Sequence, residues 1–534
     1  MKPYKSISLG YTDAINFALR NEKKLLNNVF FESTYLKKIA STSTYFVIGE
    51  KGTGKTTYAI FMANNDIYNT VSNFISINTS DYVRFYRLMK SDMLSVSKYE
   101  DIWTAILLQY TISSLYKKIS VIDKIFPSTY EKTFKEALKY YDEAALAPEK
   151  IVTREIVEEN GHGFSARLSI GDEIASSDIS IEADKAVKIK RYNSVIQSNI
   201  HKINIKFKDI INKIKLRTNF AIFIDGIDVR PEEMEYSEYI ECISGLISAA
   251  WNLNNNFFGI KKDTKGIIRI ALLLRPDIFS AVRLHNSASK ILDNSVYLNW
   301  ETTFKDYKKS ELFFLCEHIL MGQQNEESTE LCWDCYFPWK SSSETLSNNE
   351  VQHDSFVEFL RISYSRPRDL VAYLQILQDY CSDDDISVSK DIFESNDFRN
   401  IASEYLLQTI RDYTNIYISD DDFSAFRNFF PCLKGKYKFT WAEYQQAYNV
   451  FSNNVLSTLS SIPDAFSSEN KFLQFLYNAN VICYYEPAEY GDPFIRWCYR
   501  ERKMTNLRPM IPINLEYKVH NGLHKALNLG KRIR

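Results

Sequence analysis

The chain has 534 residues and a formal net charge of −2 at pH 7, and 45% of its residues are hydrophobic, 25% charged and 14% aromatic. This composition is that of folded globular proteins, so it excludes an intrinsically disordered chain and a fibrous repeat. The length predicts about two to four domains.

The sequence also disfavours a membrane or secreted protein. The most apolar stretch, "GIIRIALLLRPDIF", is interrupted by Arg269 and Arg275 and is shorter than the roughly 18 to 20 residues that span a bilayer. The first residues carry charges where a signal peptide is apolar. Eight scattered cysteines favour reduced thiols over a disulfide framework. We therefore expect a cytoplasmic protein.

After a predicted N-terminal helical segment at residues 1–40, five apolar runs have the length and composition of β-strands. Helical patterns separate the runs, which predicts an α/β fold with a parallel sheet. The five runs are Tyr45 to Ile48, Phe74 to Asn78, Phe220 to Ile224, Ile267 to Leu274, and Val296 to Asn299.

A glycine-rich loop follows the first predicted strand. Residues 49–56, "GEKGTGKT", match the phosphate-binding pattern G-x-x-x-x-G-K-[ST], and a helical pattern follows from Thr56 or Thr57. Glycines let backbone amides turn towards an anion, a lysine neutralises phosphate charge, and a threonine hydroxyl ligates Mg²⁺. The helix N-terminus adds the positive end of its dipole. The residues predicted to bind the nucleotide here are Gly49, Glu50, Lys51, Gly52, Thr53, Gly54, Lys55, Thr56 and Thr57.

The third predicted strand ends on an acid, in "NFAIFIDGIDVRPEE". Ligands bind beyond the carboxyl ends of parallel strands, so Asp225 is the predicted second Mg²⁺ ligand beside Thr56. The position after it, which usually holds a catalytic glutamate, is Gly226. Asp228, or a glutamate after it, is therefore the predicted residue that orients the attacking water. The alternative role for Asp228 is to cap the following turn.

These two motifs resemble those of the additional-strand P-loop ATPases, the AAA+ and STAND group, over roughly residues 40 to 380. The phrase "FIDGID" is similar to the acid motif of KAP-type bacterial ATPases. The N-K-x-D signature of GTPases is absent from the sequence, so ATP is the predicted nucleotide. The core, with its large insertion, would span residues 41–300, and a helical lid residues 301–384.

The resemblance also implies roles for four arginines. Arg275 occupies the sensor-1 position, where family members usually have Asn, Thr or Ser. Arg283 lies where AAA+ proteins place an arginine finger, which implies a homo-oligomer. The segment "SYSRPRDLVAYLQILQ" looks like a sensor-2 helix start, with Arg366 and Arg368 offered to the γ-phosphate.

An insertion at about residues 90–217 separates the second and third predicted strands. Helical patterns near Glu100 to Ile122 and Ser128 to Leu146, a turn at Gly161 to Gly163 and a helix from Lys185 to Arg217 are predicted within it. It is too polar to span a membrane. It is either a surface for a partner or a cap over the core.

Residues 385–534 predict a helix, a second helix and a β-hairpin, an order that resembles a winged helix. Basic residues concentrate from Phe494 to Arg534. Arg496, Arg500 and Arg502 alternate with aromatic residues, which predicts cations on the exposed face of the wing. This region would contact DNA or RNA, contact protein, or simply be a solvated charged face.

The sequence thus favours an Mg²⁺-dependent ATP hydrolase that acts as a nucleotide-driven switch or oligomeric assembly. Bacterial ATPases that it resembles frequently serve in anti-phage defence, which that resemblance implies for this chain. The alternative is a catalytically slow, ATP-gated scaffold that controls a separate effector protein; the missing glutamate favours it.

Overall fold

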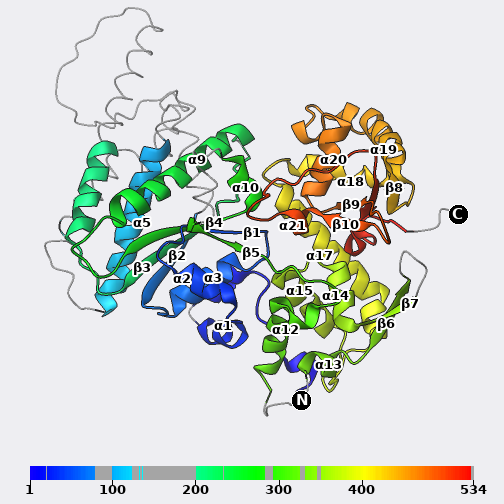
Figure 1. Ribbon diagram of the computed structural model, residues 1–534, viewed down its shortest axis with the longest axis horizontal. Coiled ribbons are helices and arrows are strands. Elements are labelled where there is room, and N and C mark those ends of the chain that lie inside the picture. The colour runs from blue at the N-terminus through cyan, green and yellow to red at the C-terminus, as the bar shows by residue number, and fades with distance from the viewer. Residues whose placement is uncertain are drawn as a thin grey trace, which may run out of the picture. The chain divides into compact units, whose positions relative to one another are not determined.

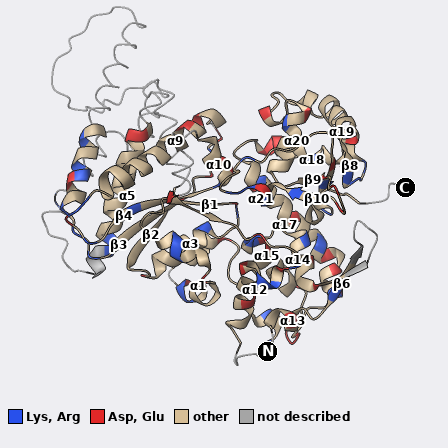
Figure 2. Ribbon diagram, viewed as in Figure 1, with Lys and Arg blue, Asp and Glu red and all other residues tan. Residues whose placement is uncertain are grey.

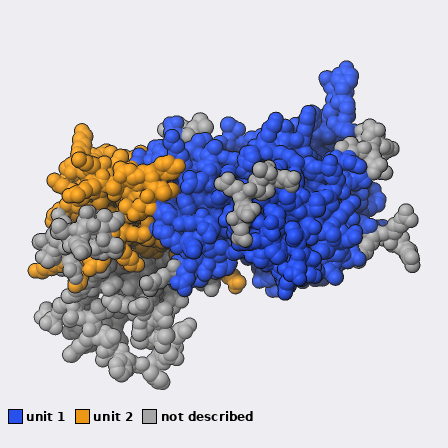
Figure 3. All heavy atoms as spheres, turned by 90° about the horizontal axis from the view of Figure 1, so that it is seen from below, with its two compact units in different colours: residues 1–65, 273–281, 286–534 blue, residues 66–272, 282–285 orange. Residues whose placement is uncertain are grey.

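The computed structural model describes residues 1–19, 21–77, 99–122, 132, 135, 200–232, 234–282, 293–324, 331–344 and 350–530. The chain divides into two compact units (Figure 3). Unit 1 comprises Met1–Asn65, Leu273–Ala281 and Asn286–Arg534, and unit 2 comprises Asp66–Leu272 and Val282–His285. Among the described helices, none combines the length and the apolar character needed to cross a membrane.

A five-stranded sheet with the order β2-β3-β4-β1-β5 forms the core, and its strands are parallel (Figure 1). Its strands are β1 (Phe46–Gly49), β2 (Thr70–Ser76), β3 (Asn219–Asp225), β4 (Ile268–Leu274) and β5 (Ser295–Leu298). All seven residues of β4 and the central five of β3 are buried, as expected of strands covered on both faces. The predicted α/β class and the five strands are confirmed, and the sheet is consistent with a P-loop NTPase core.

The second strand begins earlier than predicted. It starts at Thr70 and not at Phe74, and the polar residues Thr70 and Ser72 are buried in it. These polar residues interrupt the apolar pattern from which strands are predicted, so the pattern does not reveal the first part of the strand, before Phe74.

In unit 1, helices surround β1 and β5 and continue into the predicted lid. The N-terminal residues are tied to this lid, because the Tyr4 hydroxyl donates to the carbonyl of Leu374 at 2.9 Å. A short antiparallel hairpin, β6 (Lys340–Glu344) and β7 (Glu350–Asp354), joins two of the lid helices. The helices are α1 (Lys23–Val29), α2 (Thr34–Ala40), α3 (Lys55–Asn64), α10 (Pro276–Ala281), α12 (Glu311–Met321), α13 (Cys332–Tyr336), α14 (Ser355–Ile362) and α15 (Pro367–Gln378).

In unit 2, α5 (Tyr99–Ile122) packs against α9 (Tyr236–Leu253) (Figure 1). Gly245 permits this close approach, because a Cβ there would lie 2.5 Å from the Cβ of Tyr99. The helix predicted near Glu100 to Ile122 is confirmed. The returning helix ends at residue 213, before the predicted end at Arg217. The predicted helix at 128–146 and the turn at 161–163 lie outside the described residues.

The C-terminal part of unit 1 contains a four-stranded antiparallel sheet with the order β10-β9-β11-β8 (Figure 1). The hairpin predicted from the sequence is confirmed as β9 and β10, but β10 ends at Trp497 and a helical turn follows it. The strands are β8 (Lys438–Thr440), β9 (Ile482–Glu486), β10 (Phe494–Trp497) and β11 (Glu516–Val519). The helices are α16 (Lys390–Glu394), α17 (Asn396–Thr414), α18 (Asp420–Arg427), α19 (Trp441–Asn454), α20 (Glu469–Asn478) and α21 (Cys498–Glu501).

An aromatic cluster fills the core of this C-terminal part. Phe429 and Phe472 meet edge to face with ring centroids 4.9 Å apart, and Phe451 stacks on Phe472 at 5.1 Å. Aromatic pairs in these arrangements add to the stabilisation that burial alone provides. Much of the high aromatic content therefore forms a second core, separate from the parallel sheet.

Two histidines near the C-terminus predict how stability depends on pH. Burial lowers the pKa of His520 well below its ordinary value and lowers the pKa of His524 to about 4. Both are therefore neutral in the folded protein near pH 6, whereas the unfolded chain binds protons there. The free energy of unfolding falls as the pH drops below about 6.5, by about 1.4 kcal/mol per pH unit for each histidine.

We expect His524→Gln to remove one of these two contributions, because an amide can still donate to the carbonyl of Val519, which lies 3.1 Å from His524 Nε2. In urea titrations at pH 7.5 and pH 5.0, the wild type should lose about 2 kcal/mol more than the variant. Equal losses in the two proteins would show that His524 does not stay neutral in the fold.

Candidate nucleotide-binding site

The loop between β1 and α3 has the backbone shape of a phosphate-binding loop. Gly52 has a φ of +89° and Gly54 a φ of +90°, conformations that side chains with a Cβ rarely adopt. A Cβ on Gly52 would also approach the Cβ of Arg368 to 3.1 Å. A Cβ on Gly49 would overlap the hydroxyl of Thr53. All three glycines of the motif are therefore required by the geometry of the loop.

Lys55 is the first residue of α3, one position before the predicted helix start. Its ammonium group donates to the carbonyl of Gly49 at 2.8 Å and to that of Glu50 at 3.0 Å. The side chain therefore folds back over the loop. The first intrahelical bond runs from Tyr58 N to Gly54 O, so the amides of residues 55–57 belong to the helix N-terminus, where anions are stabilised.

In unit 2, β3 ends at the partly exposed Asp225 as predicted. Gly226 has a φ of +80°, and a Cβ there would overlap the carbonyl oxygen of Ile77. The main chain is held in this position, because Ile77 N donates to Asp225 O at 2.8 Å. The position that commonly holds a glutamate can accept no side chain, so the missing glutamate has a steric cause. Asp228 is partly exposed three residues later, and its catalytic role stays a prediction.

A glutamate introduced at position 226 should therefore destabilise this protein. We expect Gly226→Glu to lower the thermal midpoint without raising ATP turnover. For the steric contribution alone, we expect Gly226→Ala to cost more than about 3 kcal/mol. Gly491 is the matched control, because it has a φ of +88° but a Cβ there would meet no atom within 4 Å. Gly491→Ala should cost only about 1 to 2 kcal/mol. Equal losses in thermal stability for the two alanine variants would refute the steric explanation.

The two arginines at the start of α15 lie against the loop. Arg366 is buried and pairs with Asp369 through Nε–Oδ2 at 3.0 Å and Nη2–Oδ1 at 3.1 Å. Its Nη1 donates to the carbonyl of Lys51 at 2.7 Å. The amide of Arg368 donates to Gly52 O at 3.3 Å. The structure thus brings this helix to the main chain of the loop, and the γ-phosphate contact of Arg366 and Arg368 stays a prediction.

Arg275, at the exit of β4, lies in a buried charge cluster. It pairs with Asp277 through Nε–Oδ1 at 3.1 Å and Nη2–Oδ2 at 2.5 Å. Its guanidinium lies 4.0 Å from the ring centroid of Tyr413. Burial alone would raise the pKa of Asp277, but the cationic Arg275 and Arg502 and two hydrogen bonds lower that pKa well below its ordinary value. Arg283, the predicted finger, lies outside the described residues.

A buried ion pair joins Glu50 to Arg502, and no pattern in the sequence indicates it. Glu50 Oε1 lies 2.7 Å from Arg502 Nη1, and the side chains are only 7% and 2% exposed. The prediction that Arg502 lies on the exposed face of a wing is wrong, because β10 ends five residues earlier and the chain then turns inward. The partners are separated by 452 residues, so no local pattern connects them.

Several other basic residues of the C-terminal part also contact protein groups. Arg496 Nε lies 2.6 Å from Glu486 Oε2, and Arg508 Nε donates to Ser280 Oγ at 3.0 Å. Lys525 donates to Asn396 Oδ1 at 2.8 Å. Figure 2 shows acidic residues interspersed with the basic ones on these elements. The C-terminal tail from Lys531 to Arg534 lies outside the described residues.

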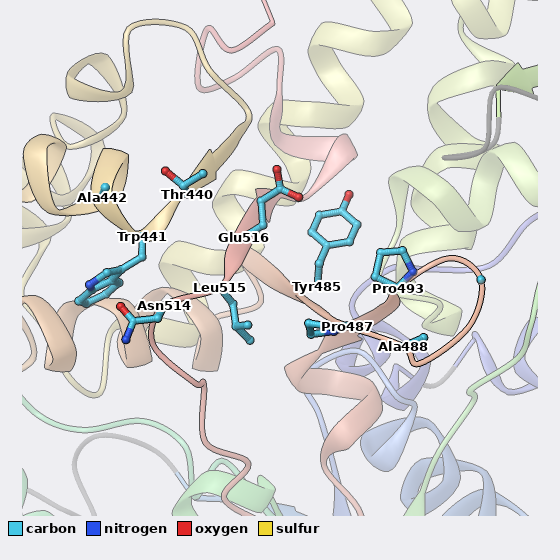
Figure 4. Close-up of a pocket in the computed structure, with 11 residues that line it drawn as sticks. Thr440, Trp441, Ala442, Tyr485, Pro487, Ala488, Pro493, Asn514, Leu515 and Glu516 are labelled. Carbon is cyan, nitrogen blue, oxygen red and sulfur yellow. The ribbon is translucent and has the colours of Figure 1, made fainter.

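A groove of about 700 Å³ opens in the C-terminal part beside the loop that joins β9 and β10 (Figure 4). Trp441 and Tyr485 contribute aromatic surface to it, and Glu516 contributes an acid whose Oε2 lies 2.7 Å from Lys438 Nζ. The ammonium of Lys438 also lies 4.7 Å from the ring centroid of Tyr485, so the charge of this acid is neutralised beside the groove. The lining residues are Thr440, Trp441, Ala442, Tyr485, Pro487, Ala488, Gly491, Pro493, Asn514, Leu515 and Glu516.

Comparison with known families agrees with this geometry. A family model described as ORC-CDC6-like, an AAA+ ATPase-related family, matches residues 17–253, less than half of the chain. The matched span contains β1, the loop, α3 and β3. No curated protein matches the chain. The family match and the parallel sheet together fit a P-loop ATPase of the AAA+ type.

Proposed function

We propose that the protein is an Mg²⁺-dependent ATPase of the AAA+ type that works as a nucleotide-driven switch or oligomeric assembly. The observation that carries this proposal is the loop after β1. Two glycines in the left-handed region turn its main chain, and Lys55 begins the helix that follows. The ORC-CDC6-like match over the same residues supports the assignment.

In this proposal the loop and the start of α3 bind the triphosphate. The amides of the loop and the helix N-terminus would donate to phosphate oxygens, because this is where backbone donors and the helix dipole favour an anion. Lys55 would exchange its bonds to the carbonyls of Gly49 and Glu50 for bonds to the outer phosphates. The loop fits this ligand, since side chains at its glycines would obstruct the turn.

Asp225 at the end of β3 and Asp228 after it complete the proposed site. Thr56 and Asp225 would hold the Mg²⁺, which when bound neutralises charge that develops on the phosphates. Asp228 would accept a proton from the attacking water and orient it, in place of a glutamate at position 226. In the sheet order β3 is separated from β1 by β4, and the meeting of Lys55 and Asp225 at one nucleotide belongs to the proposal.

The output of the proposed ATPase is a change in assembly state. AAA+ proteins commonly oligomerise, and Arg283 would complete the site of a neighbouring copy. We place this activity in a nucleic-acid-linked or anti-phage defence process of bacteria, on the resemblance of the two motifs alone. For the C-terminal part we favour a protein partner over DNA or RNA, because several of its basic residues pair with protein groups and its groove is lined by aromatic side chains.

The second candidate is an ATP-gated scaffold that hydrolyses slowly or not at all. One observation favours it: Gly226 leaves no room for the glutamate that commonly activates water. The output would then come from an effector protein that recognises the ATP-bound form.

Steady-state ATP hydrolysis by the full chain, with and without DNA or RNA, separates the two candidates. We expect Lys55→Ala and Asp225→Asn each to reduce turnover by about 100-fold or more, because each removes a charge that acts on the reacting phosphates. Lys37→Ala and Asp66→Asn change exposed residues of the same types and should leave turnover unchanged.

Asp228→Asn should lower turnover while ATP binding is kept. Tight ATP binding by the wild type with no turnover under any condition would support the scaffold. A wild type that retains no ATP would contradict both candidates.

A further inference from the structure

We infer that Arg502 is a positioning residue for the nucleotide loop, and that its buried ion pair with Glu50 couples the loop to the C-terminal part of the chain. This inference rests on the proposed ATP site. It concerns neither the phosphate contacts nor the predicted sensor residues, but the support of the loop.

Arg502 lies at a junction of four segments. Its Nη1 contacts Glu50 Oε1 in the loop at 2.7 Å, and its Nη2 donates to the carbonyl of Asn478 at the end of α20 at 3.3 Å. Its own carbonyl accepts a hydrogen bond from the hydroxyl of Tyr297 in β5 at 3.0 Å. Its guanidinium lies 5.8 Å from the ring centroid of Tyr413 in α17. A shift of Arg502 would therefore disturb its contacts with all four segments at once.

Because the ion pair is buried, each of its two charges needs the other for neutralisation. Glu50 and Arg502 are 7% and 2% exposed, so water cannot replace either partner. Glu50 Oε2 is buried and accepts no hydrogen bond from the described part of the chain. Removing one partner would leave the other as an uncompensated buried charge, which strongly destabilises its surroundings. The conformation at Glu50 is thus tied to that at Arg502.

The same cluster reaches the exit of β4. The cationic Arg275 and Arg502 both act on Asp277, and Tyr417 of the C-terminal part donates to Asp277 Oδ2 at 2.6 Å. Two buried cations and two buried anions thus stand between the loop, the β4 exit and the helices of the C-terminal part. A negatively charged phosphate bound at residues 50–57 would change the electrostatic interactions of Glu50, and through Glu50 those of the other three charged side chains.

A second contact from the next loop residue strengthens the connection. The ammonium of Lys51 lies 3.5 Å from Asp412 Oδ2 at the end of α17. The C-terminal part therefore contacts two consecutive residues of the loop, and does so immediately before the glycine at position 52. Because coupling between two sites is reciprocal, a partner whose binding displaces Arg502 would change the affinity for ATP.

The test measures ATP affinity with a fluorescent ATP analogue and Mg²⁺ on the full chain, together with thermal stability. Glu50→Gln and Arg502→Gln should each raise the Kd at least tenfold. The Kd of the double variant should not exceed the larger of the two single-variant Kd values. Arg496→Gln is the matched control, because Arg496 is partly exposed and pairs with Glu486 on the same hairpin and with Glu501 in α21. Its Kd should stay within twofold of the wild type.

An ion pair with only a structural role would give a different result. Folded Glu50→Gln and Arg502→Gln would then melt at lower temperature but bind ATP with the wild-type Kd, and this outcome overturns the inference. A wild type that binds no ATP overturns the proposed function as well, so the two failures are distinguishable.

Hydrogen exchange on the wild type tests the same coupling if these variants do not fold. ATP should slow exchange at residues 49–57 and also at residues 498–503. Protection of the loop without any change at residues 498–503 would overturn the inference.

Discussion

The turn that follows β1 is the constraint that α15 and part of the C-terminal region help to maintain. Its glycines adopt left-handed conformations, and its carbonyls accept bonds from Lys55 and Arg366. Such a turn presents amides to an anion only if its main chain is held in place. In this protein the support comes from remote parts of the chain: the start of α15 contacts the carbonyls of Lys51 and Gly52, and the C-terminal part neutralises Glu50. The loop after β1 and its supporting segments therefore form one structural element.

Buried charged side chains connect the C-terminal part to the loop after β1. The sequence concentrates cations there, yet the most deeply buried of them, Arg502, is directed at the loop and not at solvent. Arg275 and Asp277 neutralise each other beside it, with Tyr413 and Tyr417 in contact. An arrangement of this kind is stable only while each charge keeps its partner. The C-terminal part thus contributes to the support of the loop.

Local patterns predict the parts of the fold that depend on local sequence. The five strands and the strand–loop–helix unit are predictable, because apolar runs and the spacing of glycines with Lys55 reflect the backbone directly. The start of β2 is not, since buried Thr70 and Ser72 interrupt the apolar pattern. Arg502 is wrongly placed by its local pattern because its partner Glu50 is remote in sequence, and nothing near Gly226 indicates that the carbonyl of Ile77 lies against it. Such errors come from contacts between segments, which a single sequence does not reveal.

The central claim is that one Mg·ATP is bound between the loop after β1 and the acid that ends β3. An experimental structure of the full chain with Mg²⁺ and a non-hydrolysable ATP analogue tests this claim most directly. The account predicts density for the outer phosphates against the amides of residues 52–57 and Lys55 Nζ, with the metal between Thr56 and Asp225. Nucleotide bound elsewhere, or Asp225 directed away from the metal, would contradict it.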